Sequence, residues 1–523
     1  MSGPERPVTI PARVLGERAM RRLAENATPG SLQETARLLR AGELSPRQVL
    51  DDCHRRATRA NAALNCYVTI GAEQALEQAL EQSLSRFRTS APDERPLLWG
   101  IPTSVKDLTP TAGMRTTFAS RAFAEHVPPH DAPVVGRMKA AGAAVFAKTS
   151  TSEFGILPVT EPELNGVCRN PWDHTLSAGG SSGGAAASVA AGVTAVAHGS
   201  DGAGSLRIPA SCCGVFAVMP GPGRLPVTPR PALGAGAQDG VVSRTVADAI
   251  YWLTALGALD LDEVALAVSE DPWPADDHRI VLTNVPPVDC EVDPVCTAAA
   301  VAAANLLAGA GCRVEEAAPD WSADAVLDDL MLVRSTVPVA YGDPRPELLD
   351  ATTRAGLELA GRTSALDLHR AIARLGAYTQ RASRVLAEGD VLLTPTVARP
   401  SVPHGWVTAP AHPADVFRRA AHFAPFAAFA NLAGLCAVSL PLAAPAAPAA
   451  PAAPAASGVP GAPGASGVPG VPGALGALGA AASVPVGVQL MARPRDLAGL
   501  LGLALRLERL APWADRVPPV WVG

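Results

Sequence analysis

Short apolar runs alternate with helical segments from Gly100 onward, and this alternation restricts the fold more than any other feature of the chain. Strands are expected at Val105, 144–147, 194–197 and 215–218, and helices at 134–138 and 185–191. Such alternation is typical of α/β proteins, in which helices cover the faces of a sheet. We therefore predict an α/β fold with a central mixed β-sheet flanked by helices.

Length and local patterns predict one large domain with a short extension before it. At 523 residues the chain could hold several domains, but large α/β enzymes often form one unit. We expect an N-terminal extension over 1–30 and a single domain over 31–523. The first part of this domain, 31–95, is expected to be helical, because Ser31 and Ser45 each precede a Glu or Gln at the capping-box spacing.

A low-complexity segment interrupts this domain at 443–482. Alanine, proline and glycine dominate it, it contains no charged residue, and in one stretch proline recurs at every third position. Such a composition cannot bury a core or sustain a helix, and the prolines argue against a membrane span. We predict a flexible or polyproline-like insertion that joins a strand near Val438 to a strand near Val488.

Composition excludes several classes of partner. The formal net charge is −6 with acids and bases mixed along the chain, and aromatic residues make up only 4%, so neither a basic surface nor stacking side chains favour nucleic acid. The nine cysteines form no CxxC pair, and residues 1–30 contain no long apolar run. We expect a soluble, cytoplasmic protein that binds no metal, cofactor or membrane. The sequence does not determine the oligomeric state, and a homodimer is compatible with it.

Two serines in glycine-rich segments and one upstream lysine provide the groups for acyl transfer. Ser181 lies in GGSSGG, Ser205 in SDGAGSLRIPA and Lys106 in SVKD. A serine hydroxyl becomes an effective nucleophile only when a neighbouring base takes its proton. These three residues together indicate attack on an amide or ester carbonyl.

These motifs resemble the amidase signature family, in which GGSSGG precedes an alanine-rich helix and a D-x-GGS-x-R-x-PA segment. The resemblance covers most of the chain and includes GIPTSVKD at 100–107, a long segment at 131–155, DVLLTPT at 390–396, NLAGL at 431–435 and VPVGVQL at 484–490. It implies an α/β sandwich around a mixed sheet, with 31–523 as a single amidase domain. It also implies an amide hydrolase that acts on a small-molecule carboxamide through an acyl-enzyme.

In this family's pattern Ser205 is the expected nucleophile. The preceding residues Gly202, Ala203 and Gly204 can direct consecutive backbone N–H groups at one point, and a developing oxyanion requires such donors. The family usually has two glycines before the nucleophile, and here the first of them is Ala203, whose Cβ narrows the space beside the acyl carbonyl. We expect activity to survive this change. A second departure is Met219, which replaces a common lysine in the strand after the motif.

The resemblance also assigns the proton relay. Ser181, after a cis peptide bond in the family, is expected to accept the proton of the nucleophile and to pass its own to Lys106. Lys106 has to be neutral for this role, and burial favours the neutral form of a lysine. Ser182 is expected to orient its neighbours, and Asp201 and Arg207 to form a pair that holds the nucleophile loop.

Two other motifs compete with this interpretation. Residues 179–183 also fit the GxSxG nucleophile elbow, whose acid and histidine would be Asp390 and His404. Residues 142–149 nearly match a phosphate-binding loop. The expected order there is helix then strand, the reverse of that motif, which argues against nucleotide binding.

Two alternative functions remain at this level. The chain could be an amidotransferase A-type subunit that supplies ammonia to a partner, or a catalytically silent binding paralogue that kept the fold. The substrate is not legible from the sequence. We expect the variable segments 118–128, 161–168 and 327–385 to form the substrate pocket.

Overall fold

The computed structural model describes most of the chain. The described residues are 22–23, 30–71, 80–81, 84, 91, 94–226, 237–273, 279–317, 319–323, 326–342, 344–387, 389–409, 412–443 and 483–523. The predicted extension over 1–30 and the predicted insertion over 443–482 fall almost entirely outside these residues.

A mixed sheet of eight strands forms the centre of the fold, in the order β4-β6-β5-β10-β11-β9-β7-β8. Strands β7, β8 and β9 run parallel to one another, and the other neighbours pair antiparallel. The strands are β4 (Val196–Asp201), β5 (Phe216–Met219), β6 (Gln238–Ser243), β7 (Ile280–Leu282), β8 (Val314–Glu316), β9 (Val391–Pro395), β10 (Cys436–Ala443) and β11 (Val486–Ala492). The predicted α/β class with a central mixed sheet is confirmed.

A smaller sheet stands beside the large one. Its order is β1-β3-β2, and its strands are β1 (Tyr67–Ile70), β2 (Pro102–Lys106) and β3 (Ala144–Thr149). Strand β2 pairs parallel to β3 and lies next to β4 of the large sheet. The ends of β2 and β4 therefore meet where the two sheets adjoin, which brings two distant segments of sequence together.

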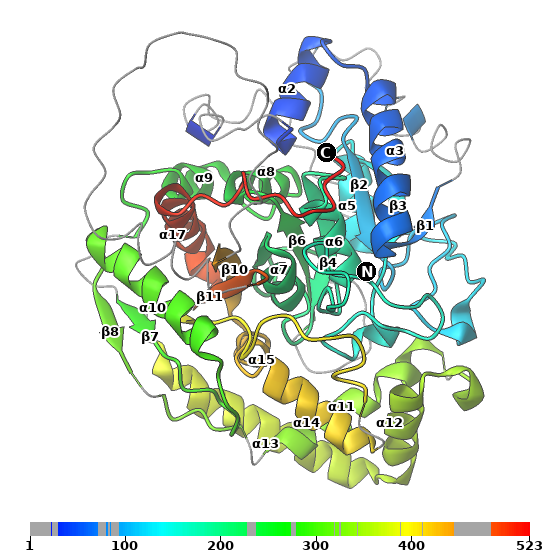
Figure 1. The fold of residues 1–523 in the computed structure, drawn as a ribbon, viewed down its shortest axis with the longest axis vertical. Coiled ribbons are helices and arrows are strands. Elements are labelled where there is room, and N and C mark those ends of the chain that lie inside the picture. Colours follow the sequence, from blue (N-terminus) through cyan, green and yellow to red (C-terminus); the bar gives the residue numbers. More distant parts are fainter. Residues whose placement is uncertain are drawn as a thin grey trace, which may run out of the picture.

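Helices cover both faces of the large sheet (Figure 1). They are α2 (Leu32–Ala41), α3 (Pro46–Leu64), α5 (Pro133–Ala140), α6 (Gly183–Ala190), α7 (Arg207–Cys213), α8 (Val246–Ala255), α9 (Leu261–Ala267), α10 (Pro294–Gly309), α11 (Leu327–Ser335), α12 (Ala351–Arg362), α13 (Ala365–Ala382), α14 (Pro413–Phe423), α15 (Ala427–Leu432) and α17 (Leu497–Leu510). Figure 1 shows α11 to α14 gathered on the side of the molecule opposite α2 and α3.

Alternate residues of the central strands belong to different apolar clusters. In β10, Val438 and Leu440 belong to one cluster that includes residues of α10 and α17, two helices that contact this strand. Ala437 of the same strand belongs to another cluster, with Met491 of β11 and Phe429 of α15. Successive side chains of a strand point to opposite faces, so a strand covered on both faces reads as a continuous apolar run.

Helix starts follow the sequence signals closely. Ser45 forms a full capping box with Gln48 at the start of α3. Ser31 accepts a hydrogen bond from the Glu34 N–H at the start of α2, but the carboxylate of Glu34 binds Arg37 instead of closing the box. Helices α2 and α3 begin where these signals predicted, whereas strand β1 lies inside the segment 31–95 that was predicted to be helical.

Strand β4 differs from its prediction. The apolar pattern predicted a strand over 194–197, whereas β4 begins at Val196 and continues to Asp201. The extra polar residues are held by pairing with β6, and the buried His198 binds Asp239 of that strand at 3.1 Å. The polar end of β4 is stabilised by its pairing with β6, and such pairing leaves no apolar pattern in the sequence of β4 itself.

Candidate active site

The three residues of the predicted relay lie near the junction of the two sheets. Lys106 is the last residue of β2, Ser181 lies just before α6, and Ser205 lies in the loop between β4 and α7. The Lys106 Nζ atom donates to the carbonyl oxygen of Ser200 in β4 at 3.2 Å. The side chain of Lys106 thus spans from one sheet to the other.

Lys106 and Ser181 are in direct contact. The Lys106 Nζ atom donates to the Ser181 Oγ atom at 2.7 Å, and both residues are buried. The peptide bond between Gly180 and Ser181 is cis, as the family resemblance implied. A Cβ atom on Gly180 would lie 2.6 Å from the backbone nitrogen of Val159, so only glycine fits before this serine.

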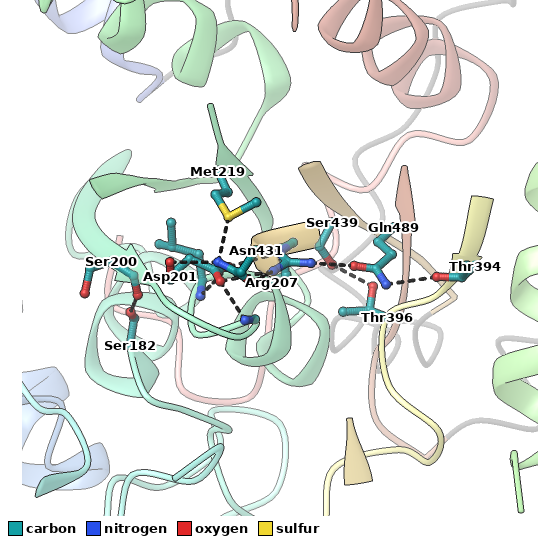
Figure 2. A network of polar contacts seen from close by, with 12 residues as sticks. Ser182, Ser200, Asp201, Arg207, Met219, Thr394, Thr396, Asn431, Ser439 and Gln489 are labelled. Carbon is teal, nitrogen blue, oxygen red and sulfur yellow. Dashed lines mark hydrogen bonds and ion pairs between the residues drawn. The ribbon is translucent and has the colours of Figure 1, made fainter. Parts of the chain in front are cut away.

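Ser182 joins the two serine segments. Its N–H donates to the Ser205 carbonyl oxygen at 3.0 Å, and its Oγ atom donates to the Ser200 carbonyl oxygen at 3.1 Å. Figure 2 shows the second of these contacts beside Asp201. Through these bonds the backbone that carries Ser181 is held against the backbone that carries the predicted nucleophile.

The loop that carries Ser205 is held in one conformation by Gly204 and Asp201. Gly204 has φ +105°, and a Cβ atom there would lie 2.4 Å from the Cβ atom of Ala427. Its N–H donates to the Asp201 Oδ1 atom at 2.6 Å, and the Leu206 N–H donates to Oδ2 at 3.2 Å. The Gly204 N–H therefore faces a carboxylate here, which differs from the expectation that it points at an oxyanion together with those of Gly202 and Ala203.

Asp201 and Arg207 form a buried bidentate pair. The Arg207 Nε and Nη2 atoms each donate to a different carboxylate oxygen of Asp201 at 3.0 Å. Burial alone would raise the pKa of Asp201, but the charge of Arg207 and the hydrogen bonds to the carboxylate outweigh burial and lower it. The pair is fully removed from solvent.

Two residues without a sequence-predicted role complete this network, as Figure 2 shows. The Arg207 Nη2 atom donates to Asn431 Oδ1 at 2.7 Å, and its Nη1 atom donates to Gln489 Oε1 at 2.9 Å. The Asn431 Nδ2 atom returns a bond to the Asp201 carbonyl oxygen at 2.9 Å. The same Nδ2 atom lies 3.1 Å from the sulfur of Met219. Met219, which replaces a lysine common in the family, therefore contacts this network.

Sequence reasoning missed Asn431 and Gln489. Both lie in segments that carried the family resemblance, NLAGL and VPVGVQL, and a polar residue inside each apolar run was the available signal. Asn431 comes from α15 and Gln489 from β11, while Arg207 comes from α7. Only the packing of these elements brings the three side chains together.

A cavity of about 470 Å³ opens beside the predicted nucleophile. Ser205 and Ala203 lie in its wall, and most of the remaining wall is apolar. Side chains from α11, α13, α14 and α15 line it, among them Met331, Tyr378 and Phe417. A concave, mainly apolar site with a few polar groups is typical of small-molecule binding.

The prediction of which segments line this cavity was correct only for 327–385. The segments 118–128 and 161–168 do not contribute to the wall. Phe118 instead packs against Tyr341 and Phe123 in an aromatic cluster, with ring centroids 4.7 and 5.2 Å apart.

The competing motifs find no support in the structure. The carboxylate of Asp390 binds Arg279 at 3.0 Å, and His404 binds the carbonyl oxygen of His174 at 3.0 Å, so neither belongs to a nucleophile elbow at Ser181. Helix α5 precedes strand β3, which is the reverse of a phosphate-binding loop. Within the described ranges no cluster of three His, Cys, Asp or Glu side chains could hold a metal ion, and no helix is long and apolar enough to cross a membrane.

Comparison with known proteins gives a family match and similar relatives over most of the chain. The family model described as Amidase matches residues 48–501. The putative amidase AmiB2 of Mycobacterium tuberculosis is 32% identical over 492 residues, which cover 93% of this chain and 97% of that protein. An acylamidase of Rhodococcus erythropolis is 32% identical over 397 residues, or 71% of this chain and 80% of that protein. The solved structure of 6-aminohexanoate cyclic dimer hydrolase complexed with substrate is similar with a TM-score of 0.76 and 27% identity, covering 94% of this chain and 98% of that one.

Proposed function

This chain belongs to the amidase family of C–N bond hydrolases, and from that premise we propose that it cleaves a small carboxamide through an acyl-enzyme on Ser205. The observation that carries the proposal is the 2.7 Å contact between Lys106 Nζ and Ser181 Oγ, buried near a cavity whose wall contains Ser205. A base, a hydroxyl bridge and a nucleophile beside a substrate-sized space are the parts that acyl transfer needs.

The first half of the reaction forms the acyl-enzyme. The Ser205 Oγ atom attacks the substrate carbonyl carbon, its proton passes to Ser181 Oγ, and the Ser181 proton passes to neutral Lys106. The carbonyl oxygen becomes an oxyanion, for which we propose the N–H groups of Gly202 and Ala203 as donors. Collapse of this intermediate breaks the C–N bond, and the proton held by the relay returns to the leaving nitrogen.

The second half regenerates the enzyme. Water attacks the acyl carbon and gives a proton to the same relay, and the bond to Ser205 Oγ breaks as that oxygen takes the proton back. Gly204 supports both halves indirectly, because its N–H bond to Asp201 holds the loop that carries the donors. Removing one oxyanion donor typically lowers the rate by about 10²–10³.

The nucleophile is tested by covalent labelling. A fluorophosphonate probe should modify Ser205 in the native enzyme, and Ser205→Ala should lose both labelling and hydrolysis of a panel of simple amides. Ser188→Ala is the matched control, because this buried serine lies in α6 and donates to the carbonyl oxygen of Ala185 in the same helix at 2.9 Å. Labelling that persists in Ser205→Ala and maps to Ser181 or Ser182 would refute the assignment.

A further inference from the structure

One guanidinium lies inside the cavity next to the proposed reaction centre. The acidic, basic and histidine side chains of the wall are Asp289, Asp328, Arg334, Arg418 and His422. Asp289, Asp328 and Arg418 are exposed, as expected for residues at the mouth. Arg334 is half-buried, in the last turn of α11, and shares the wall with Ser205.

The contacts of Arg334 tie it to the relay. Its Nη2 atom donates to the carbonyl oxygens of Gly155, at 3.2 Å, and of Ile156. Gly155 borders the relay directly, since a Cβ atom built on it would lie 3.3 Å from Ser181 Oγ. The guanidinium is therefore separated from the proposed bridging serine by a single backbone segment.

The charge of Arg334 lacks a carboxylate partner of its own. Among the residues that the structure describes, none forms an ion pair with it, and its Nη1 and Nε groups bind no protein acceptor. Burial lowers the pKa of Arg334 to about 10, and the attraction of Asp201 opposes that shift only in part. Asp201 is already bonded through both carboxylate oxygens to Arg207.

A positive charge held in a mainly apolar wall is costly unless an anion compensates it. Arg334 stays protonated at neutral pH, because its lowered pKa still lies well above 7. A guanidinium offers donors in a planar fork that matches a carboxylate better than any neutral group. The missing partner is therefore most simply supplied by the substrate.

We propose that Arg334 binds a carboxylate of the substrate, so that the preferred substrates are amides that carry a carboxylate close to the scissile bond and an apolar remainder. This proposal rests on the proposed amidase function and narrows its substrate class. The apolar wall around Met331, Leu375 and Phe429 accommodates the remainder, while the carboxylate lies beside the relay.

The test compares matched pairs of substrates. One series consists of mono-4-nitroanilides of dicarboxylic acids of increasing length, each compared with the neutral carboxamide of the same length. A second series places the carboxylate on the amine side of the scissile bond. In at least one series the native enzyme should show a kcat/KM about 10- to 100-fold higher for the acid than for its neutral partner, which is the range for a hydrogen bond to a charged group.

Variants assign this preference to Arg334. Arg334→Met should bring the ratio between acid and neutral substrate close to one while it retains hydrolysis of the neutral substrate, and Arg334→Lys should keep part of the preference. Arg418→Met is the matched control, because Arg418 lines the same cavity but is exposed and paired with Asp415. This control should leave the ratio unchanged.

The outcomes separate this inference from the function it rests on. Equal loss of both substrates in Arg334→Met, or a native ratio near one in both series, would overturn the role of Arg334 and leave Ser205-dependent hydrolysis intact. Hydrolysis that survives Ser205→Ala would instead refute the function. Binding can also be measured without turnover, by calorimetry of glutarate with the Ser205→Ala variant. This variant should bind glutarate, and the double variant Ser205→Ala/Arg334→Met should not. Equal binding by the single and the double variant would count against the inference.

Discussion

Removing Arg207 should destabilise the protein far more than removing an exposed arginine with the same kind of partner. Arg207→Met leaves the Asp201 carboxylate buried without its ion pair, and Asn431 and Gln489 each lose a donor. Breaking a buried pair by removing one partner typically costs about 3–5 kcal/mol, because an uncompensated charge stays buried. That is a large share of the roughly 5–15 kcal/mol by which native proteins are stable.

The matched control is the bidentate pair between Arg374 and Asp329. Its bonds are as short, 2.8 and 2.6 Å, but the side chain of Arg374 is 56% exposed. Because solvent screens the charge of the exposed Arg374 side chain, Arg374→Met should lower the free energy of unfolding less than Arg207→Met does. The two variants differ in the burial of the arginine and in the further bonds that Arg207 donates to Asn431 and Gln489.

The assay is urea unfolding followed by tryptophan fluorescence at pH 7, together with kcat on one amide. Arg207→Met should lower the free energy of unfolding by about 3–5 kcal/mol and also lower kcat, because Asp201 then no longer holds the nucleophile loop in place. Arg207→Lys should lower the free energy of unfolding by an amount between those of Arg207→Met and Arg374→Met, since an ammonium keeps the charge but lacks the planar fork. If Arg207→Met costs no more than Arg374→Met, the stabilising role assigned to this network is wrong.

Three further predictions concern the relay, the pH dependence of stability and the low-complexity segment. Lys106→Ala and Ser181→Ala should each lower kcat by several orders of magnitude, and the double variant should be little worse than either, whereas multiplicative losses would contradict a shared relay. Burial raises the pKa of Asp248 to about 7 and of Glu508 to about 8. Between their ordinary pKa values and these raised values, both groups stay protonated in the folded protein but ionise in the unfolded chain, so unfolding titrations should show stability falling as the pH rises from about 5 to about 8, with a smaller fall in Glu508→Gln. Replacing 444–482 by a short Gly/Ser loop should leave the melting temperature and the turnover near the native values, because β10 and β11 are already paired neighbours. A selective change in the preference between small and large amides would instead show that this segment shapes the site.

Much of the fold could be predicted because its signals are local. Capping residues, short apolar runs and the alternation of strands with helices depend on near neighbours in the chain, and α3, β3 and α6 appeared where these signals placed them. Strand β4 was placed too early for the same reason. Its end at Asp201 is stabilised by β6, and a partner from another part of the chain leaves no trace in the local pattern.

The chemical groups of the candidate site can be recognised in the sequence: two serines in glycine-rich segments, a lysine after an apolar run, and an Asp and Arg around the proposed nucleophile. The two serines can be recognised because the backbone conformations around them require glycine at neighbouring positions, as at Gly204.

Which of these groups come into contact depends on the packing of the whole fold. Asn431 and Gln489 reach Arg207 from separate elements, the Gly204 N–H donates to Asp201, and Arg334 lines the cavity with no carboxylate partner among the described residues. The physical reason is that a side chain's charge and hydrogen bonds depend on neighbours in space, and the packing of α7, α11, α15 and β11 sets those neighbours at long distances in the chain.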